Sequence, residues 1–187
     1  YDGFNRFHNM SILLAPFLAA LGFPAVLHGC HAVSPKNGIT THKLLLAANK
    51  NPLKTVNDVH KCLHNSDIGW GYIDQQLFFD DFHALTDLRA KLVKRPVLAT
   101  IEKFMVPFQA NKTYLVTGYT HPPYRQKSID LLDELSAIDN YLIVRGIEGS
   151  AQLSMDRRNP AIIKHNGHLT ETYLRPTQFN IEETERA

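Results

Sequence analysis

The sequence has few cysteines, no long uninterrupted apolar run and almost no excess of charge. Two cysteines, Cys30 and Cys62, are too few for a disulfide framework and fit a reducing compartment. The longest apolar run, residues 12–23, is interrupted by Pro16 and Gly22 and is too short to span a bilayer. No secretory signal is visible. These absences predict a cytoplasmic protein with no membrane partner.

The net charge and the hydrophobic content indicate which class of protein this is. The 20 basic and 18 acidic residues give a net charge of +2, so the whole-chain charge provides no argument for nucleic acid. A hydrophobic content of 44% is ordinary for a globular fold, and 187 residues suffice for one sizeable domain. Because the chain begins at Tyr1 rather than at methionine, we expect that earlier residues are missing.

Apolar segments of strand and helix periodicity alternate along the chain. The predicted strands are residues 24–28, 68–73, 114–119 and 141–144, followed by a hairpin of residues 161–164 and 169–174 around Asn166-Gly167. The predicted helices are residues 10–21, 39–48, 56–64, 75–94, 97–108 and 128–138. Strands that alternate with helices predict an α/β fold, with a mostly parallel central sheet flanked by helices and an antiparallel edge.

The most informative segment is the polar loop at residues 27–38, between the first predicted strand and a helix. A strand, a small polar loop and a helix start, in that order, can form a cradle for an anion. Gly29 and Gly38 let the backbone approach a ligand closely. Three residues between them carry donor groups: Ser34, Lys36 and Asn37. The pattern indicates a phosphate site, although an ordinary loop between strand and helix has the same pattern.

The same loop holds side chains that suit acid–base or nucleophilic chemistry. His28 and His31 have the side chain for proton transfer, but a hydrogen bond of His28 to its own loop is the alternative. Cys30 is either a nucleophile or a small buried thiol. The cysteines and the histidines beside them lack the spacing of a zinc site. No catalytic residue follows from these patterns, and no metal ligands are assigned.

Taken in order, these segments resemble the anthranilate phosphoribosyltransferase family and the nucleoside phosphorylases that share its fold. His28-Gly29, Ser34 and Gly38 match in register the family's second glycine-rich loop. Residues 9–11, Asn-Met-Ser, resemble the segment after its first phosphate loop, of which residues 2–3, Asp-Gly, would be the remnant. Two further segments also match: residues 105–108 resemble its Leu-Gly-Pro-Leu turn, and residues 117–122 resemble a strand end.

The resemblance implies a phosphoribosyltransferase-like domain over residues 1–187, a helical subdomain largely absent from this chain, and a homodimer. It also implies a sugar-phosphate or nucleotide-like ligand and a reaction of pentosyl transfer. The residues that would bind the ligand are Asp2, Gly3, Asn9, Ser11, His28, Gly29, Ser34, Lys36, Asn37 and Gly38.

Several residues depart from the family's pattern. Leu27 and His31 stand where the family has lysine and arginine, which removes positive charge that would face a pyrophosphate. The family implies Mg²⁺, but its adjacent Asp-Glu pair has no counterpart beside Glu148. We therefore expect a degenerate pyrophosphate and Mg²⁺ site. Glu148-Gly149 and residues 103–108 resemble a divergent branch of the family, whose members include glycosyltransferases and a dimeric nucleic-acid-binding protein.

Two other functions remain open from the sequence. One is a catalytically silent, nucleic-acid-binding dimer, which would grip phosphates with a basic face. The residues of that face would be Arg89, Lys91, Lys94, Arg95, Lys103, Arg125 and Lys127, unless they are simply solvated charges. The other is an interaction surface at residues 77–92, where Phe78, Phe79 and Phe82 would be exposed or would pack against another chain.

Overall fold

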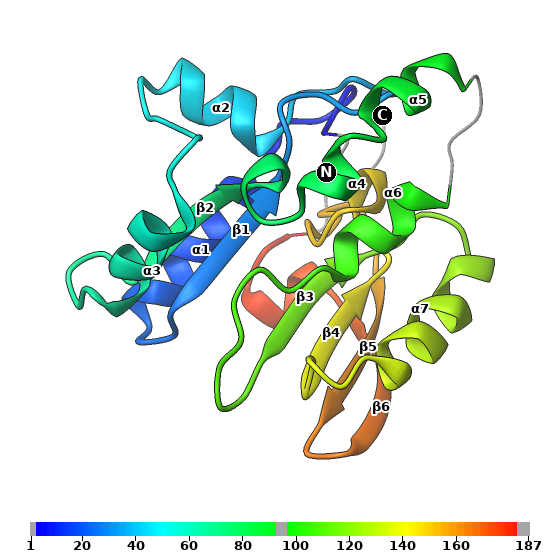
Figure 1. Cartoon of the computed structure of the whole chain (residues 1–187). Helices are drawn as coiled ribbons and strands as arrows, with labels where there is room; N and C mark the ends of the chain where they lie inside the picture. The colour runs from blue at the N-terminus through cyan, green and yellow to red at the C-terminus, as the bar shows by residue number, and fades with distance from the viewer. Residues whose placement is uncertain (1–2, 93–96, 183–187) are drawn as a thin grey trace. The chain divides into compact units, whose positions relative to one another are not determined.

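The computed structural model describes residues 3–92 and 97–182, in a chain that divides into two compact units (Figure 1). The first unit is Tyr1–Pro107 and the second is Phe108–Ala187. The predicted α/β class is confirmed, because one unit holds a parallel sheet and the other a mixed sheet with an antiparallel edge, each flanked by helices. The prediction of a single phosphoribosyltransferase-like domain stays a prediction.

The first unit is built on two parallel strands, β1 (Ala25–Gly29) and β2 (Trp70–Asp74). Their register pairs Ala25 with Trp70 and Gly29 with Asp74, so both strands end at the same edge. Helix α1 packs against β1, and helix α3 packs against β2. The helical segments of this unit are η1 (Ser11–Leu13), α1 (Leu14–Ala20), α2 (Thr41–Ala47), α3 (Val56–His64), η2 (Gln75–Leu77), α4 (Asp80–His83), α5 (Thr86–Lys91), α6 (Leu98–Ile101) and η3 (Glu102–Phe104).

Local side-chain chemistry explains where several of these helices begin. Thr55 caps α3, because its hydroxyl accepts a hydrogen bond from the Asp58 N–H at 3.1 Å. Thr40 caps α2 in the same way through the N–H of Lys43, at 3.3 Å. Pro16 lies in the first turn of α1, where its missing N–H leaves no hydrogen bond unmade.

The helix predicted at residues 75–94 is wrong as a single element, because the chain breaks it into η2, α4 and α5. The Asp74 carboxylate accepts from the Gln76 N–H at 3.2 Å and starts only a short turn. Phe79 then leaves the helical region, with φ −153° and ψ 66°. The Thr86 hydroxyl donates to the His83 carbonyl and makes a second break. Residues 93–94 lie outside the described residues.

The helix predicted at residues 97–108 is also shorter than expected. It consists of α6 followed by η3 and ends at Phe104. Met105 is extended, with φ −68° and ψ 138°, and Pro107 follows without an N–H to continue the helix.

The second unit contains a four-stranded sheet in the order β3-β4-β5-β6. Strands β3 and β4 are parallel, whereas β5 and β6 add an antiparallel hairpin around Asn166-Gly167, as predicted. Helix α7 starts before the predicted residue 128, because Pro123 occupies its first turn. Its elements are β3 (Tyr114–Gly118), α7 (Pro123–Glu134), β4 (Asn140–Val144), η4 (Ile147–Gly149), β5 (Asn159–His165), β6 (His168–Leu174) and η5 (Pro176–Phe179).

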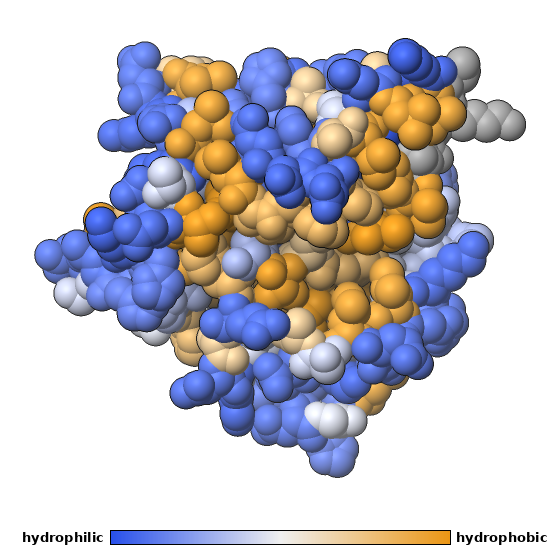
Figure 2. All heavy atoms as spheres, in the orientation of Figure 1, coloured by the Kyte–Doolittle hydropathy of each residue, from blue (hydrophilic) through white to orange (hydrophobic). Residues whose placement is uncertain are grey.

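Apolar side chains are exposed as well as buried. On the face drawn in Figure 2, hydrophobic residues lie among hydrophilic ones at the surface. On and just beyond α1, Phe17 is 71% exposed and Leu21 is 63% exposed. In the predicted interaction surface, Phe79 is 41% exposed, while Phe78 and Phe82 are half-buried. Among the described residues, every helix is too short or too polar to cross a membrane.

Candidate functional site

The candidate site lies in the first unit, at the edge where β1 and β2 end. The loop after β1 runs through residues 30–40 to the start of α2. The chain after β2 begins with Asp74 and Gln75, which are buried. In open parallel sheets, ligands bind outside the carboxyl ends of the strands, so this edge is where a ligand is expected.

The N-terminal segment lies directly against the loop after β1. Phe4 and Ile39 form an antiparallel bridge, with N–O distances of 3.2 and 2.8 Å. A Cβ on Gly3 would lie 2.6 Å from the backbone of Gly38, and a Cβ on Gly38 would lie 2.7 Å from the backbone of Gly3. Both positions therefore need glycine. Asn9 extends the contact, because its side-chain amide donates to the Ile39 carbonyl at 3.0 Å.

The two predicted phosphate segments are thus brought together in space. Gly3, Asn9 and Ser11 come from the first segment, and Ser11 donates to the Asn9 side-chain oxygen. Asp2, predicted beside them, lies outside the described residues. Ser34 and Lys36 lie in the second segment, both half-buried.

Some backbone N–H and carbonyl groups of the loop after β1 are used in hydrogen bonds within the protein. The Asn37 N–H donates to the Val33 carbonyl at 2.9 Å, and Asn37 has a positive φ of 50°. Lys43 donates to the carbonyls of Asn37 and Gly38, at 3.2 and 3.0 Å. The Lys36 ammonium lies 5.7 Å from the centre of the Phe4 ring. The loop is therefore preorganised, with fewer backbone donors for an anion than the sequence predicts.

His28, near the end of β1, and Cys30, directly after it, differ from the acid–base and nucleophilic chemistry predicted for them. Burial lowers the pKa of His28 to about 3, so its imidazole is neutral at physiological pH. Burial raises the pKa of Cys30 to about 12, and the negative charges of Glu102 and Asp74 act in the same direction. Cys30 is therefore a protonated thiol, which donates to the Gln75 side-chain oxygen at 3.3 Å. Its thiol is not activated as a nucleophile.

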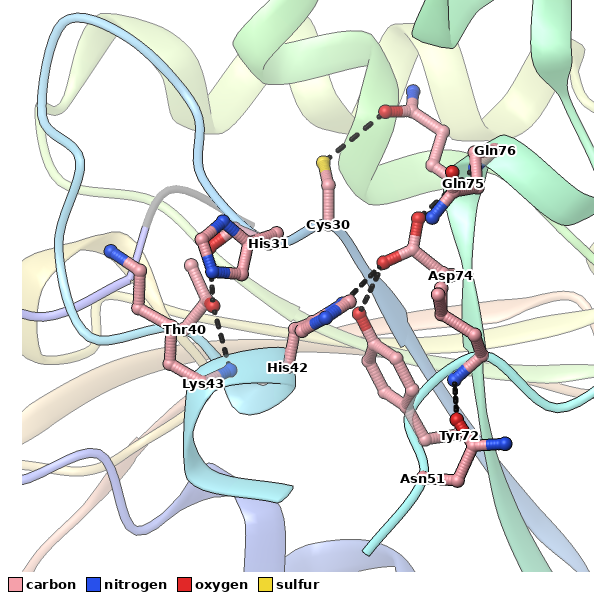
Figure 3. Close-up of polar contacts among 11 residues, drawn as sticks. Cys30, His31, Thr40, His42, Lys43, Asn51, Tyr72, Asp74, Gln75 and Gln76 are labelled. Carbon is pink, nitrogen blue, oxygen red and sulfur yellow. Dashed lines mark hydrogen bonds and ion pairs between the residues drawn. The ribbon is translucent and has the colours of Figure 1, made fainter. Parts of the chain in front are cut away.

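A buried His–Asp pair lies at the same edge and was missed by the sequence analysis. Figure 3 shows His42, from the first turn of α2, directed toward Asp74 at the end of β2. His42 Nδ1 lies 2.6 Å from Asp74 Oδ2, with 5% and 0% of the two side chains exposed. The Tyr72 hydroxyl donates to the same oxygen at 3.3 Å. The His31 ring meets the His42 ring edge-on, with centroids 5.1 Å apart.

A second buried polar cluster continues from Gln75. Its side-chain amide lies 3.4 Å from Glu102 Oε1, which also accepts from Arg89 Nη1. Among the described residues, Glu102 Oε2 and the Nε and Nη2 atoms of Arg89 are buried and have no hydrogen-bond partner. Arg89 is therefore a core residue, and its prediction as part of an exposed basic face is wrong.

The other predicted basic residues are distributed over both units. Lys91 is exposed and Lys103 is half-buried in the first unit. In the second unit, Arg125 pairs with Glu171, and Lys127 is exposed. Lys94 and Arg95 lie outside the described residues.

The carboxylates do not assemble a magnesium site in the part of the chain that the structure describes. No group of three or more histidine, cysteine, aspartate or glutamate side chains there is placed to hold a metal ion. Glu148 lies in the short turn η4 with a positive φ of 51°. These residues do not fit the Mg²⁺ ion that the family resemblance implies.

Comparisons with known proteins find distant similarity to anthranilate phosphoribosyltransferases, in agreement with the resemblance noted from the sequence. No family model matches the chain. An uncharacterized protein of Aquifex aeolicus is 34% identical over 182 residues, which cover 97% of this chain and 52% of that protein. An anthranilate phosphoribosyltransferase of Petrotoga mobilis is 26% identical over 93% of this chain and 48% of its own length. One of Lacticaseibacillus casei is 23% identical over 100% of this chain and 52% of its own.

The chain therefore spans about half the length of the curated relatives that it matches. These similarities establish a distant relationship to anthranilate phosphoribosyltransferases.

Proposed function

We propose that this chain is phosphoribosyltransferase-like and binds a sugar phosphate at the carboxyl edge of β1 and β2. One observation carries the proposal: the backbone of Gly3 and Phe4 lies against that of Gly38 and Ile39. Two segments that were both predicted to bind phosphate thus meet at the edge where parallel sheets bind ligands. The relatives named anthranilate phosphoribosyltransferase support the same class of ligand.

The side chains at this edge suit a weakened phosphate site. The Ser34 hydroxyl and the Lys36 ammonium supply the donors that an anionic oxygen needs. Leu27 and Pro35 supply neither charge nor hydroxyl, so the affinity for a pyrophosphate group is lower than a fuller set of donors would give. Transfer of the ribosyl group to an acceptor would follow if that group is held in line with it.

Calorimetric titration of the chain with phosphoribosyl diphosphate, with and without Mg²⁺, tests the proposal. We expect Ser34→Ala and Lys36→Ala each to weaken binding by about tenfold, the equivalent of one charge-assisted hydrogen bond. Lys61→Ala on α3 is the matched control, because Lys61 is exposed and lies outside the loop. Unchanged affinity in both loop variants would remove the assignment.

The same preparation tests the nucleic-acid alternative. Salt-dependent binding of single-stranded DNA, together with no binding of phosphoribosyl diphosphate, would support a catalytically silent nucleic-acid-binding protein. Binding of phosphoribosyl diphosphate with no detectable DNA affinity at low salt would exclude it.

A further inference from the structure

The buried pair of His42 and Asp74 lies at the same strand edge as the candidate site. We propose that His42 Nε2 takes the proton of the acceptor group during transfer, with Asp74 as the residue that positions the imidazole. This inference rests on the proposed function, because it uses the sugar phosphate bound there. It adds the chemical class of the second substrate: an acceptor with an N–H or O–H group.

The hydrogen bonds assign the two nitrogens of His42 to different roles. A carboxylate only accepts hydrogen bonds, so Nδ1 of His42 donates to Asp74 Oδ2 at 2.6 Å. In its neutral form, the ring then carries its lone pair on Nε2. Asp74 is itself held in place, because its Oδ2 also accepts from the Tyr72 hydroxyl and its Oδ1 accepts from the Gln76 N–H. The tautomer and the ring orientation of His42 are therefore both set.

Nothing in the described part of the chain uses Nε2. The hydrogen bond of His42 is the one to Asp74, and its ring meets the rings of His31 and Tyr72 edge-on. No serine, threonine or cysteine of the described residues is hydrogen-bonded to it, as a protein nucleophile would be. A base oriented by a carboxylate but without a protein nucleophile suits a nucleophile that arrives with the substrate.

Residues on either side of His42 are hydrogen-bonded to the predicted phosphate loop. His42 lies two residues after Thr40, whose hydroxyl donates to the His31 carbonyl at 3.0 Å. Lys43, which directly follows His42, donates hydrogen bonds to the carbonyls of Asn37 and Gly38. Binding of a phosphate to the loop therefore acts on the same turn of α2 that carries the base.

The step balances without a further reagent. The acceptor nitrogen or oxygen forms a bond to C1 of the ribosyl group as the bond from C1 to the pyrophosphate oxygen breaks. The pyrophosphate leaves with that electron pair, and the acceptor's proton passes to His42 Nε2. Asp74 stabilises the imidazolium that results, and the proton is then released to solvent.

The alternative is that the hydrogen bond between His42 and Asp74 has only a structural role and stabilises the position of α2 relative to β2. The test compares His42→Gln, Asp74→Asn and Tyr72→Phe with His64→Gln, an exposed histidine on α3 of the same unit. Phosphoribosyl diphosphate is the probe, with water, ammonia and an aromatic amine as acceptors. Binding is measured by calorimetry and turnover by release of pyrophosphate, and circular dichroism confirms that each variant is folded.

We expect His42→Gln to bind the probe within about twofold of the unsubstituted chain and to release pyrophosphate about 100-fold more slowly. Asp74→Asn slows release as well, and Tyr72→Phe, the milder change, slows it less. His64→Gln leaves both quantities unchanged. Equal turnover by His42→Gln, or a chain that binds the probe and releases no pyrophosphate with any acceptor, overturns the inference. If the pair of His42 and Asp74 had only a structural role, His42→Gln would lower the stability of the chain and would not slow pyrophosphate release while leaving binding of the probe intact.

Reaction with diethyl pyrocarbonate, mapped by mass spectrometry, is a second measurement that does not depend on turnover. It acylates an unprotonated imidazole nitrogen that is open to reagent. We expect His42 to be modified in the unsubstituted chain and to be protected by phosphoribosyl diphosphate. An unmodified His42 beside a modified His64 overturns the inference. If the probe does not bind at all, the proposed function fails, and modification of His42 then decides whether Nε2 is an open base.

Discussion

The buried ion pair of Arg89 and Glu102 allows a quantitative test of how the first unit is stabilised. Only 3% and 2% of the two side chains are exposed. Glu102 Oε1 accepts from Arg89 and lies 3.4 Å from the Gln75 amide nitrogen. Three polar atoms of the pair have no hydrogen-bond partner in the part of the chain that the structure describes: Glu102 Oε2, Arg89 Nε and Arg89 Nη2. The pair is thus deeply desolvated and only partly compensated.

Removing one charge leaves the other buried and unpaired. We therefore expect Glu102→Ala or Arg89→Met to lower the free energy of unfolding by about 3–5 kcal/mol. The double variant Arg89→Met/Glu102→Leu removes both charges together with the three unpartnered atoms, each of which costs about 1–3 kcal/mol. Its free energy of unfolding should therefore equal or exceed that of the unsubstituted chain.

Urea unfolding followed by tryptophan fluorescence is the assay, because Trp70, the one tryptophan of the chain, lies in β2 of the same unit. With a slope of about 1–3 kcal/mol per molar urea, the single variants should move the midpoint by about 2 M. Lys91→Ala is the control on α5, with an expected change within about 0.5 kcal/mol. A single variant that costs less than about 1 kcal/mol, or a double variant as unstable as the single ones, would refute the reasoning.

Three further predictions test other parts of the structure. Thr55→Ala removes the cap on Asp58 N–H and should cost about 1 kcal/mol, seen as faster amide exchange in α3 but not in α7. Gly118→Ala places a Cβ against the backbone oxygen of Ser150, so thermal unfolding should show a loss of about 1–3 kcal/mol, and a neutral result would contradict the packing. Because the pKa of His28 falls from 6.5 unfolded to about 3 folded, the unfolded chain binds more protons between these values. Stability is therefore lost as the pH falls, by at most about 2 kcal/mol between pH 7 and 5, and His28→Gln should remove that part of the slope in urea titrations.

Features set by neighbouring residues could be predicted from the sequence. The Thr55 cap needs only a threonine three residues before Asp58, and the hairpin turn needs only Asn166-Gly167 between two apolar runs. In both cases the interaction partners are within a few positions, so the sequence contains the whole signal.

Features that depend on distant residues could not be predicted in this way. His42 and Asp74 are 32 positions apart and meet only because β1 and β2 pair in register and α2 follows the loop. The available signal was weak: a carboxylate that ends an apolar strand, and a histidine among apolar residues in a short helix. Similarly, the apolar periodicity of residues 75–94 says nothing of the Asp74 and Thr86 side chains that divide the helix.

The buried polar groups of the first unit gather where its strands end, and this placement has a physical consequence. Cys30 and Asp74 directly follow or end β1 and β2, and Gln75 links them to Glu102. Burying polar groups lowers stability unless they are fully paired, and Glu102 is not. A domain selected for stability alone would fill this edge with apolar side chains. The face of β2 is packed in that way, because the buried Val59 lies against Gly71. Departures from such packing are expected at functional sites, so the polar edge and the two predicted phosphate segments indicate the same location.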